Sequence, residues 1–97
     1  MKFYLGKHYY DEWGVPDGRP FLEIIEGEKW IQSISVASIL VRLGVPQTQD
    51  EQEIKQLVSQ FIQQEYGITE PHFLTFKEFH GAFPEAYGTQ NMDAMIP

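Results

Sequence analysis

The chain has 97 residues, which is the size of one small domain, because a second hydrophobic core would need roughly 50 more residues. Its 14 acidic and 7 basic residues give a net charge of −7, which argues against direct binding to duplex nucleic acid or to an anionic membrane surface. It contains no cysteine, which excludes disulfides, thiolate zinc sites and cysteine nucleophiles.

No segment has the pattern of a signal peptide or a membrane span. Residues 1–8 carry charge without a continuous apolar run behind them. The most apolar stretch, residues 34–41, is interrupted by Ser35 and Ser38 and is too short to cross a bilayer. We therefore expect a cytoplasmic protein.

The first third of the chain has the pattern of β-strands. Residues 2–10, 21–26 and 29–34 are rich in aromatic and β-branched side chains. Pro16-Asp17-Gly18 favours a type I turn after the first of these runs, and Gly27 favours a tight turn after the second. The sequence predicts a three-stranded antiparallel meander over about residues 2–34.

The hydrophobic period then changes from strand to helix. A first helix over about residues 36–44 is indicated by apolar residues at helical spacing, with Ser33 or Ser35 as its N-cap and Gly44 as its C-cap. A second helix over about residues 50–66 has one apolar stripe: Ile54, Leu57, Val58, Phe61 and Ile62. Its capping box is either Thr48 with Glu51 or Asp50 with Glu53.

A third, short helix is predicted over about residues 75–83, because Thr75 and Glu78 also form a capping box. Residues 88–97 lack a firm pattern, and their composition permits disorder. We therefore expect one α+β domain over residues 1–87, in which two or three helices cover the meander, followed by a C-terminal tail at 88–97.

The sequence points to no enzyme, metal site or cofactor. It has no glycine-rich phosphate loop and no nucleophile elbow. Its three histidines, His8, His72 and His80, lack the spacing that puts two imidazoles on one helical face. We predict no catalytic residue, no metal ligand and no cofactor.

The clustered acidic residues fall into two kinds. Asp50, Glu51 and Glu53 crowd the predicted start of a helix, where the helix dipole alone accounts for them. Two groups surround the predicted hairpin turns instead: Asp11, Glu12, Asp17, Glu23, Glu26 and Glu28. These six are either solvated turn residues or an acidic rim that faces a partner.

An aromatic run accompanies the first acidic group. Tyr9, Tyr10 and Trp13 flank Asp11 and Glu12, and tyrosine and tryptophan are enriched at interface centres. Because adjacent residues of a strand point to opposite faces, one of the two tyrosines should lie on the outer side of the sheet. The alternative is that these rings pack at the edge of the core.

The outer face of the second predicted helix is rich in amides. This face consists of Gln52, Gln56, Ser59, Gln60, Gln63 and Gln64. Lys55, in its middle, is the one charged residue. A solvated helix usually alternates Glu and Lys. The face is therefore either ordinary solvated surface or a surface for self-association.

Near its C-terminal end the chain reads Thr-Phe-Lys-Glu-Phe-His-Gly-Ala-Phe-Pro-Glu-Ala-Tyr-Gly from Thr75, and then Asn-Met-Asp-Ala at residues 91–94. Over residues 75–96 this resembles the barstar-like family, with one extra residue between Gly88 and Asn91. The resemblance implies a small acidic intracellular inhibitor that covers the basic active site of a secreted ribonuclease. Asp93 would occupy an acidic partner-binding position.

These patterns predict a non-catalytic acidic protein that occludes a basic, nucleic-acid-handling protein, as an immunity protein or a phage anti-defence (anti-CRISPR type) inhibitor does. The predicted contact residues are Tyr9, Tyr10, Asp11, Glu12, Trp13, Asp17, Glu23, Glu26, Glu28 and Asp93. The alternative is a structural or regulatory subunit of a homodimer or larger complex, which would use its sheet edge or the amide face.

Overall fold

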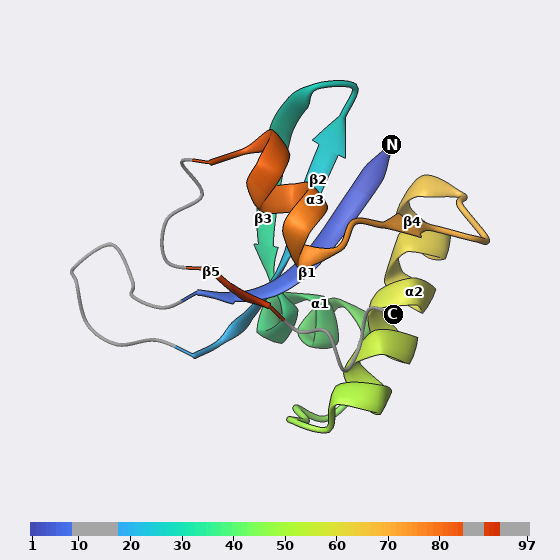
Figure 1. Ribbon diagram of the computed structural model, residues 1–97. Helices are drawn as coiled ribbons and strands as arrows, with labels where there is room; N and C mark the ends of the chain where they lie inside the picture. Colours follow the sequence, from blue (N-terminus) through green and yellow to red (C-terminus); the bar gives the residue numbers. More distant parts are fainter. Residues whose placement is uncertain (9–17, 85–88, 92–97) are drawn as a thin grey trace.

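The computed structural model describes residues 1–8, 18–84 and 89–91. Within these residues a mixed β-sheet is covered by helices on both faces (Figure 1). The predicted α+β class is confirmed.

Three strands form the antiparallel part of the sheet. They are β1 (Lys2–His8), β2 (Pro20–Glu26) and β3 (Lys29–Ser35), which lie in the order β3-β2-β1. In the register, Tyr4 is opposite Glu23, and Glu23 is opposite Ser33. These strands agree closely with the predicted meander.

The sheet is larger than the meander, because two short strands extend it beside β1. The strand β4 (His72–Phe73) is parallel to Lys2 and Phe3, and β5 (Thr89–Asn91) is antiparallel to residues 6–8. Strands of two and three residues are too short to show a period of two in the sequence. Residues 89–91, which the sequence analysis assigned to the C-terminal segment, form a strand of the sheet.

The three helices are α1 (Val36–Leu43), α2 (Glu51–Tyr66) and α3 (Phe76–Ala82), close to the predicted ranges. Their N-caps are Ser35, Asp50 and Thr75. The Asp50 side chain accepts a hydrogen bond of 2.9 Å from the Glu53 N–H. The structure thus selects Ser35 and Asp50 from the predicted alternatives.

The main core lies between the sheet and the helices α1 and α2. It contains eleven buried side chains from four elements: Phe3, Leu5, Leu22, Ile24, Val36, Ile39, Leu40, Ile54, Val58, Phe61 and Ile62. Full burial of such a side chain contributes about 1.5–3 kcal/mol. This apolar layer accounts for the apolar stripes that the sequence shows.

The opposite face of the sheet is covered by α3 and carries a smaller, aromatic core. Tyr4, Ile25, Leu74 and Phe79 are buried there. The alternation of side chains along β1 explains the division, because Phe3 and Leu5 point to the main core while Tyr4 points to α3. Since α3 has only seven residues, parts of this face stay exposed.

Candidate functional site

Most of the predicted contact residues lie outside the described residues, namely Tyr9, Tyr10, Asp11, Glu12, Trp13, Asp17 and Asp93. The three that the structure describes are Glu23, Glu26 and Glu28. Glu26 and Glu28 are exposed at the turn between β2 and β3, whereas Glu23 is buried.

The prediction that Glu23 belongs to an exposed acidic rim is wrong. Glu23 lies in the middle of β2 and is 1% exposed. The Ser33 hydroxyl donates a hydrogen bond of 2.6 Å to its Oε1. Its neighbours Leu22 and Ile24 point to the main core, so the alternation of the strand turns the Glu23 side chain to the face that α3 covers. Its place inside the run Phe-Leu-Glu-Ile-Ile is the signal that could have indicated burial.

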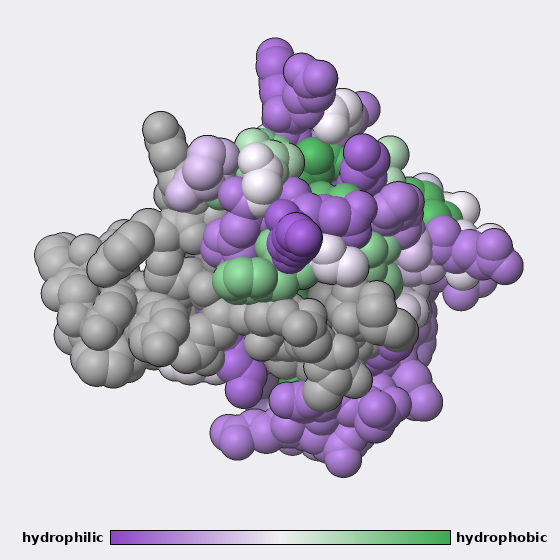
Figure 2. All heavy atoms as spheres, viewed as in Figure 1, coloured by the Kyte–Doolittle hydropathy of each residue, from purple (hydrophilic) through white to green (hydrophobic). Residues whose placement is uncertain are grey.

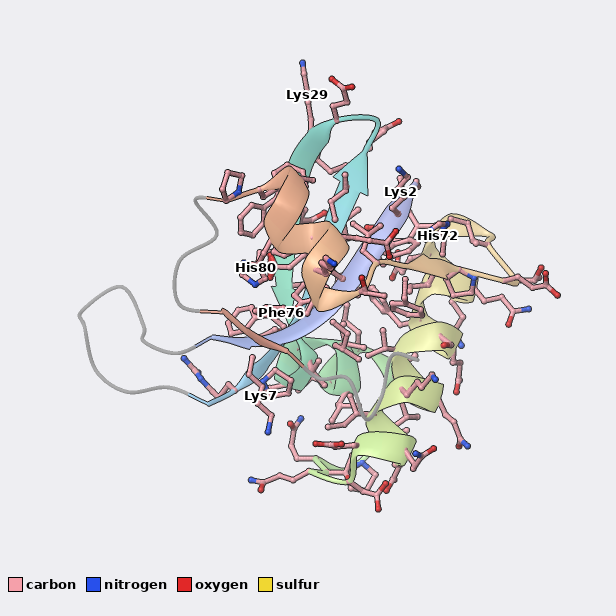
Figure 3. All side chains as sticks on the ribbon, in the orientation of Figure 1. Lys2, Lys7, Lys29, His72, Phe76 and His80 are labelled. Atoms are coloured by element: carbon pink, nitrogen blue, oxygen red, sulfur yellow. The ribbon has the colours of Figure 1, made fainter. Side chains whose placement is uncertain are left out.

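The turn between β2 and β3 brings two acidic side chains next to a lysine. Gly27 adopts a positive φ of 63°, which favours glycine, and Glu26 is opposite Lys29 in the register. In Figure 3, Lys29 extends from this turn at the top of the sheet. The turn therefore presents Glu26 and Glu28 to the solvent with partial compensation by Lys29.

A groove of 570 Å³ lies between this turn, the start of β1 and α3. Apolar side chains of Ile25, Leu74 and Phe83 line it, and both Glu28 and Glu78 border it. Lys2 also lines the groove and supplies one positive charge. The groove thus combines an apolar surface with two carboxylates and one ammonium group.

The carboxylate of Glu78 is held in place by the start of α3. It accepts a hydrogen bond of 3.0 Å from the Thr75 N–H, and the Glu78 N–H donates to the Thr75 hydroxyl at 3.1 Å. The bond from the Thr75 backbone is the main reason why the pKa of Glu78 lies below its ordinary value, and His72 and Lys2 lower the pKa further. Glu78 is therefore negatively charged at neutral pH.

An aromatic cluster lies next to the groove and shares Phe83 with it. The Tyr4 and Phe79 rings stack with centroids 4.2 Å apart and an interplanar angle of 5°. The half-buried Trp30 meets Phe79 edge to face at 5.2 Å and lies 5.8 Å from Phe83. The sequence analysis did not identify Trp30 or Phe83 as site residues. The Phe79–Phe83 spacing of four residues behind a capping box was the available signal.

A second groove lies at the other end of β1, which Lys7 marks in Figure 3. It measures 360 Å³, and Lys7 and Arg19 line it together with Glu51 and Thr48. This groove therefore has charges of both signs. Its two cationic side chains and one carboxylate leave a net charge of +1, opposite in sign to that of the first groove.

The predicted amide face of α2 is present on the surface. Gln52, Gln56, Gln60 and Gln63 are exposed, and they line a shallow hollow of 490 Å³.

On the face of the molecule that Figure 2 shows, hydrophilic residues predominate at the upper and lower ends, and apolar residues reach the surface between them.

His80 lies on α3 among aromatic rings, 4.3 Å from Phe76 and 5.3 Å from Phe79 between ring centroids. Burial lowers its pKa.

Among the described residues, no cluster of three or more histidine, aspartate or glutamate side chains could ligate a metal ion. In the same part of the chain, none of the helices combines the length and the apolar character that a bilayer crossing requires.

Comparison of the chain with protein-family models, curated proteins and solved structures found no significant match. The resemblance to the barstar-like family therefore stays a prediction, as does the role of Asp93.

Proposed function

We propose that the chain is a non-catalytic, cytoplasmic acidic protein that binds and occludes a basic, nucleic-acid-handling protein, as an immunity protein or a phage anti-defence inhibitor does. The observation that carries this proposal is the groove between the β2–β3 turn and α3. Its apolar lining ends at the carboxylates of Glu28 and Glu78.

Such a groove suits a lysine or arginine side chain of a partner. The aliphatic stem of the partner's side chain would cover Ile25 and Phe83, and its charged head would reach the carboxylates. Lys2 offsets one of the two negative charges. The charged side chains that line the groove therefore have a net charge of −1, which favours a cation over an anion.

The distribution of charge supports a basic partner. The described residues contain nine acidic and all seven basic side chains, which leaves a net charge of −2. The five remaining acidic residues of the 14 occur without any lysine or arginine: Asp11, Glu12, Asp17, Glu85 and Asp93. Most of the net charge of −7 thus belongs to residues 9–17, 85–88 and 92–97.

Two of these acidic segments are joined in the sequence to residues that are neighbours in the sheet. Residues 9–17 follow His8, residues 85–88 precede Thr89, and His8 and Thr89 are register partners of β1 and β5. The predicted contact residues Tyr9, Tyr10 and Trp13 belong to the first segment. We include both segments in the proposed binding surface as a second region.

The mechanism is electrostatic complementarity. Carboxylates replace the phosphates of nucleic acid, which speeds association with a basic surface, and aromatic side chains slow dissociation. Duplex DNA carries one charge per about 1.7 Å of axis, far more densely than seven net charges on a domain of this size. The protein would therefore imitate a few phosphates and not a long duplex.

The test is quantitative capture of proteins from an extract of the organism that encodes the chain. The bait is the wild type, a Glu28→Gln/Glu78→Gln variant, or a Glu51→Gln/Glu53→Gln control. Glutamine at position 78 retains the capping box, so the first variant loses charge without losing the helix start. The control removes the same charge at the start of α2, beside the second groove.

We expect the wild type and the control to retain a basic nuclease or nucleic-acid-binding protein, and about 0.5 M salt to release it. The Glu28→Gln/Glu78→Gln variant should retain about tenfold less, because two charged contacts are lost. Retention that is insensitive to salt, or a captured set without basic nucleic-acid-handling proteins, would contradict the proposal. Equal retention by all three baits would move the contact away from the groove.

A further inference from the structure

Among the described residues that line the groove between the β2–β3 turn and α3, Lys2 is the one with a positive charge. In the sheet it is opposite Ile25 of β2 and beside His72 of β4 (Figure 3). Because side chains alternate along a strand, Lys2 points to the same face of β1 as Tyr4, which is the face that α3 covers. The register therefore brings the Lys2 side chain to the edge of the groove.

Lys2 acts on Glu78 without forming an ion pair with it. Among the described residues, neither Glu28 nor Glu78 makes an ion pair with Lys2. The hydrogen bond from the Thr75 backbone is the main reason for the low pKa of Glu78, and the charges of His72 and Lys2 lower this pKa further. The Lys2 ammonium group is thus near enough to attract the carboxylate of Glu78, which stays exposed to a ligand.

We propose that Lys2 sets the affinity of the groove for a cationic side chain, because its ammonium group competes with the partner's for Glu28 and Glu78. The proposal rests on the function proposed above and names the residue that limits it. With Lys2, the charged side chains that line the groove have a net charge of −1, and without it they would have −2. At a separation of about 5–10 Å in an aqueous dielectric, one unit charge changes the affinity for a cation by a factor of about two to four.

Lys29, the other lysine of this region, does not have the same role. It extends from the β2–β3 turn (Figure 3) and is opposite Glu26 in the register. It is not part of the lining of the groove, so its charge acts first on Glu26. Lys2 is therefore the position at which one substitution changes the charge of the groove most directly.

The test is an NMR titration with N-acetyl-arginine methylamide, which carries one guanidinium group and no other charge. The backbone amide signals of Glu28 and Ala82, which line the groove, report binding up to about 100 mM probe at constant ionic strength. The proteins are the wild type, Lys2→Gln, Lys2→Arg and the matched control Lys55→Gln. The control removes the same charge from α2, where Lys55 lines a different hollow.

We expect Lys2→Gln to bind the probe about threefold more tightly than the wild type, and Lys2→Arg and Lys55→Gln to match the wild type. A second readout needs no ligand. In a carbon-detected NMR titration of the Glu78 carboxyl group, Lys2→Gln should raise the pKa of Glu78, because the ammonium group no longer favours the carboxylate. Because Lys2 is exposed, these substitutions should leave the fold intact.

Equal affinities of the wild type and Lys2→Gln for the probe, or an unchanged pKa of Glu78, would overturn the role of Lys2 and leave the proposed function in place. An equal gain in affinity by Lys55→Gln would assign the effect to the net charge of the whole chain and would also overturn this role. A probe that shifts the groove signals in neither the wild type nor Lys2→Gln would contradict the groove as a cation site, on which both proposals rest.

Discussion

The hydroxyl of Ser33 donates a hydrogen bond of 2.6 Å to the carboxylate of Glu23, and the two residues are opposite each other in β3 and β2. Glu23 is 1% exposed, whereas Ser33 is exposed. An accessible residue thus donates to one oxygen of a buried carboxylate, whose other oxygen, Oε2, is buried without a hydrogen-bond partner. Buried polar groups are costly unless they are hydrogen-bonded. The hydrogen bond from Ser33 therefore offsets part of the free-energy cost of burying Glu23.

Ser33→Ala should lower the free energy of unfolding by about 1–3 kcal/mol, because the buried carboxylate of Glu23 loses a donor. Gln32→Ala, at the neighbouring exposed position, should change it by less than about 0.5 kcal/mol. Urea denaturation at neutral pH measures both values. Equal stabilities of the two variants would show that the bond contributes nothing.

Phe79→Ala should destabilise the protein by about 3–5 kcal/mol, because the fully buried ring stacks on Tyr4 and contacts Trp30. Phe76→Ala, on the same helix, should cost far less, because Phe76 is 38% exposed. Thermal denaturation followed by Trp fluorescence compares the two. A cost for Phe76→Ala that matches that of Phe79→Ala would contradict the assignment of the aromatic core.

Two glycines should respond to alanine in opposite directions. Gly67 ends α2 with a φ of 68°, which alanine adopts only with strain, so Gly67→Ala should destabilise by about 1 kcal/mol. Gly81 lies inside α3 and has open space for a Cβ, so Gly81→Ala should stabilise by about 0.5–1 kcal/mol. Changes of the same sign in chemical denaturation would contradict this difference.

The start of α3 should contribute to the dependence of stability on pH. The folded state lowers the pKa of Glu78, chiefly through the hydrogen bond from the Thr75 backbone. The resulting stabilisation is present above the ordinary glutamate pKa and is lost as the pH falls through the lowered value. The excess in free energy of unfolding of the wild type over Glu78→Gln should therefore shrink between about pH 6 and about pH 3. An excess that stays constant in urea denaturation across this range would exclude the effect.

His80 should act at higher pH. Burial lowers its pKa, so that the unfolded chain takes up a proton at a pH where the folded protein does not. Stability should therefore be constant above about pH 6.5 and fall as the pH drops from there through the lowered pKa. His80→Gln should lose less stability over this range. A proton NMR titration of the imidazole should give a midpoint below 6.5, and a midpoint above that value would reverse the prediction.

The elements with a long repeating pattern were predictable from the sequence. The stripe of α2, the caps at Ser35, Asp50 and Thr75, and the three main strands follow from local chemistry. In each case the signal lies within a few neighbouring residues. The expected and observed bounds therefore differ by only one or two residues at most ends.

The remainder depends on contacts between distant residues. The strands β4 and β5 exist because β1 offers them an edge, which no local pattern reveals. Glu23 lies on the face of the sheet that is covered by α3, about 55 positions further along the chain. The groove needs side chains from β1, β2 and α3 together. The sequence analysis therefore placed Glu23 at the surface, whereas the side chain is buried.

The strand β1 has partners at very different distances along the chain. It pairs with β2 through a connection of eleven residues, but it meets β4 and β5 only after more than sixty. Closing a long loop costs more chain entropy and slows folding. We therefore expect the β1–β2–β3 hairpins and α2 to acquire protection in the first phase of refolding, and β5 to dock on β1 last.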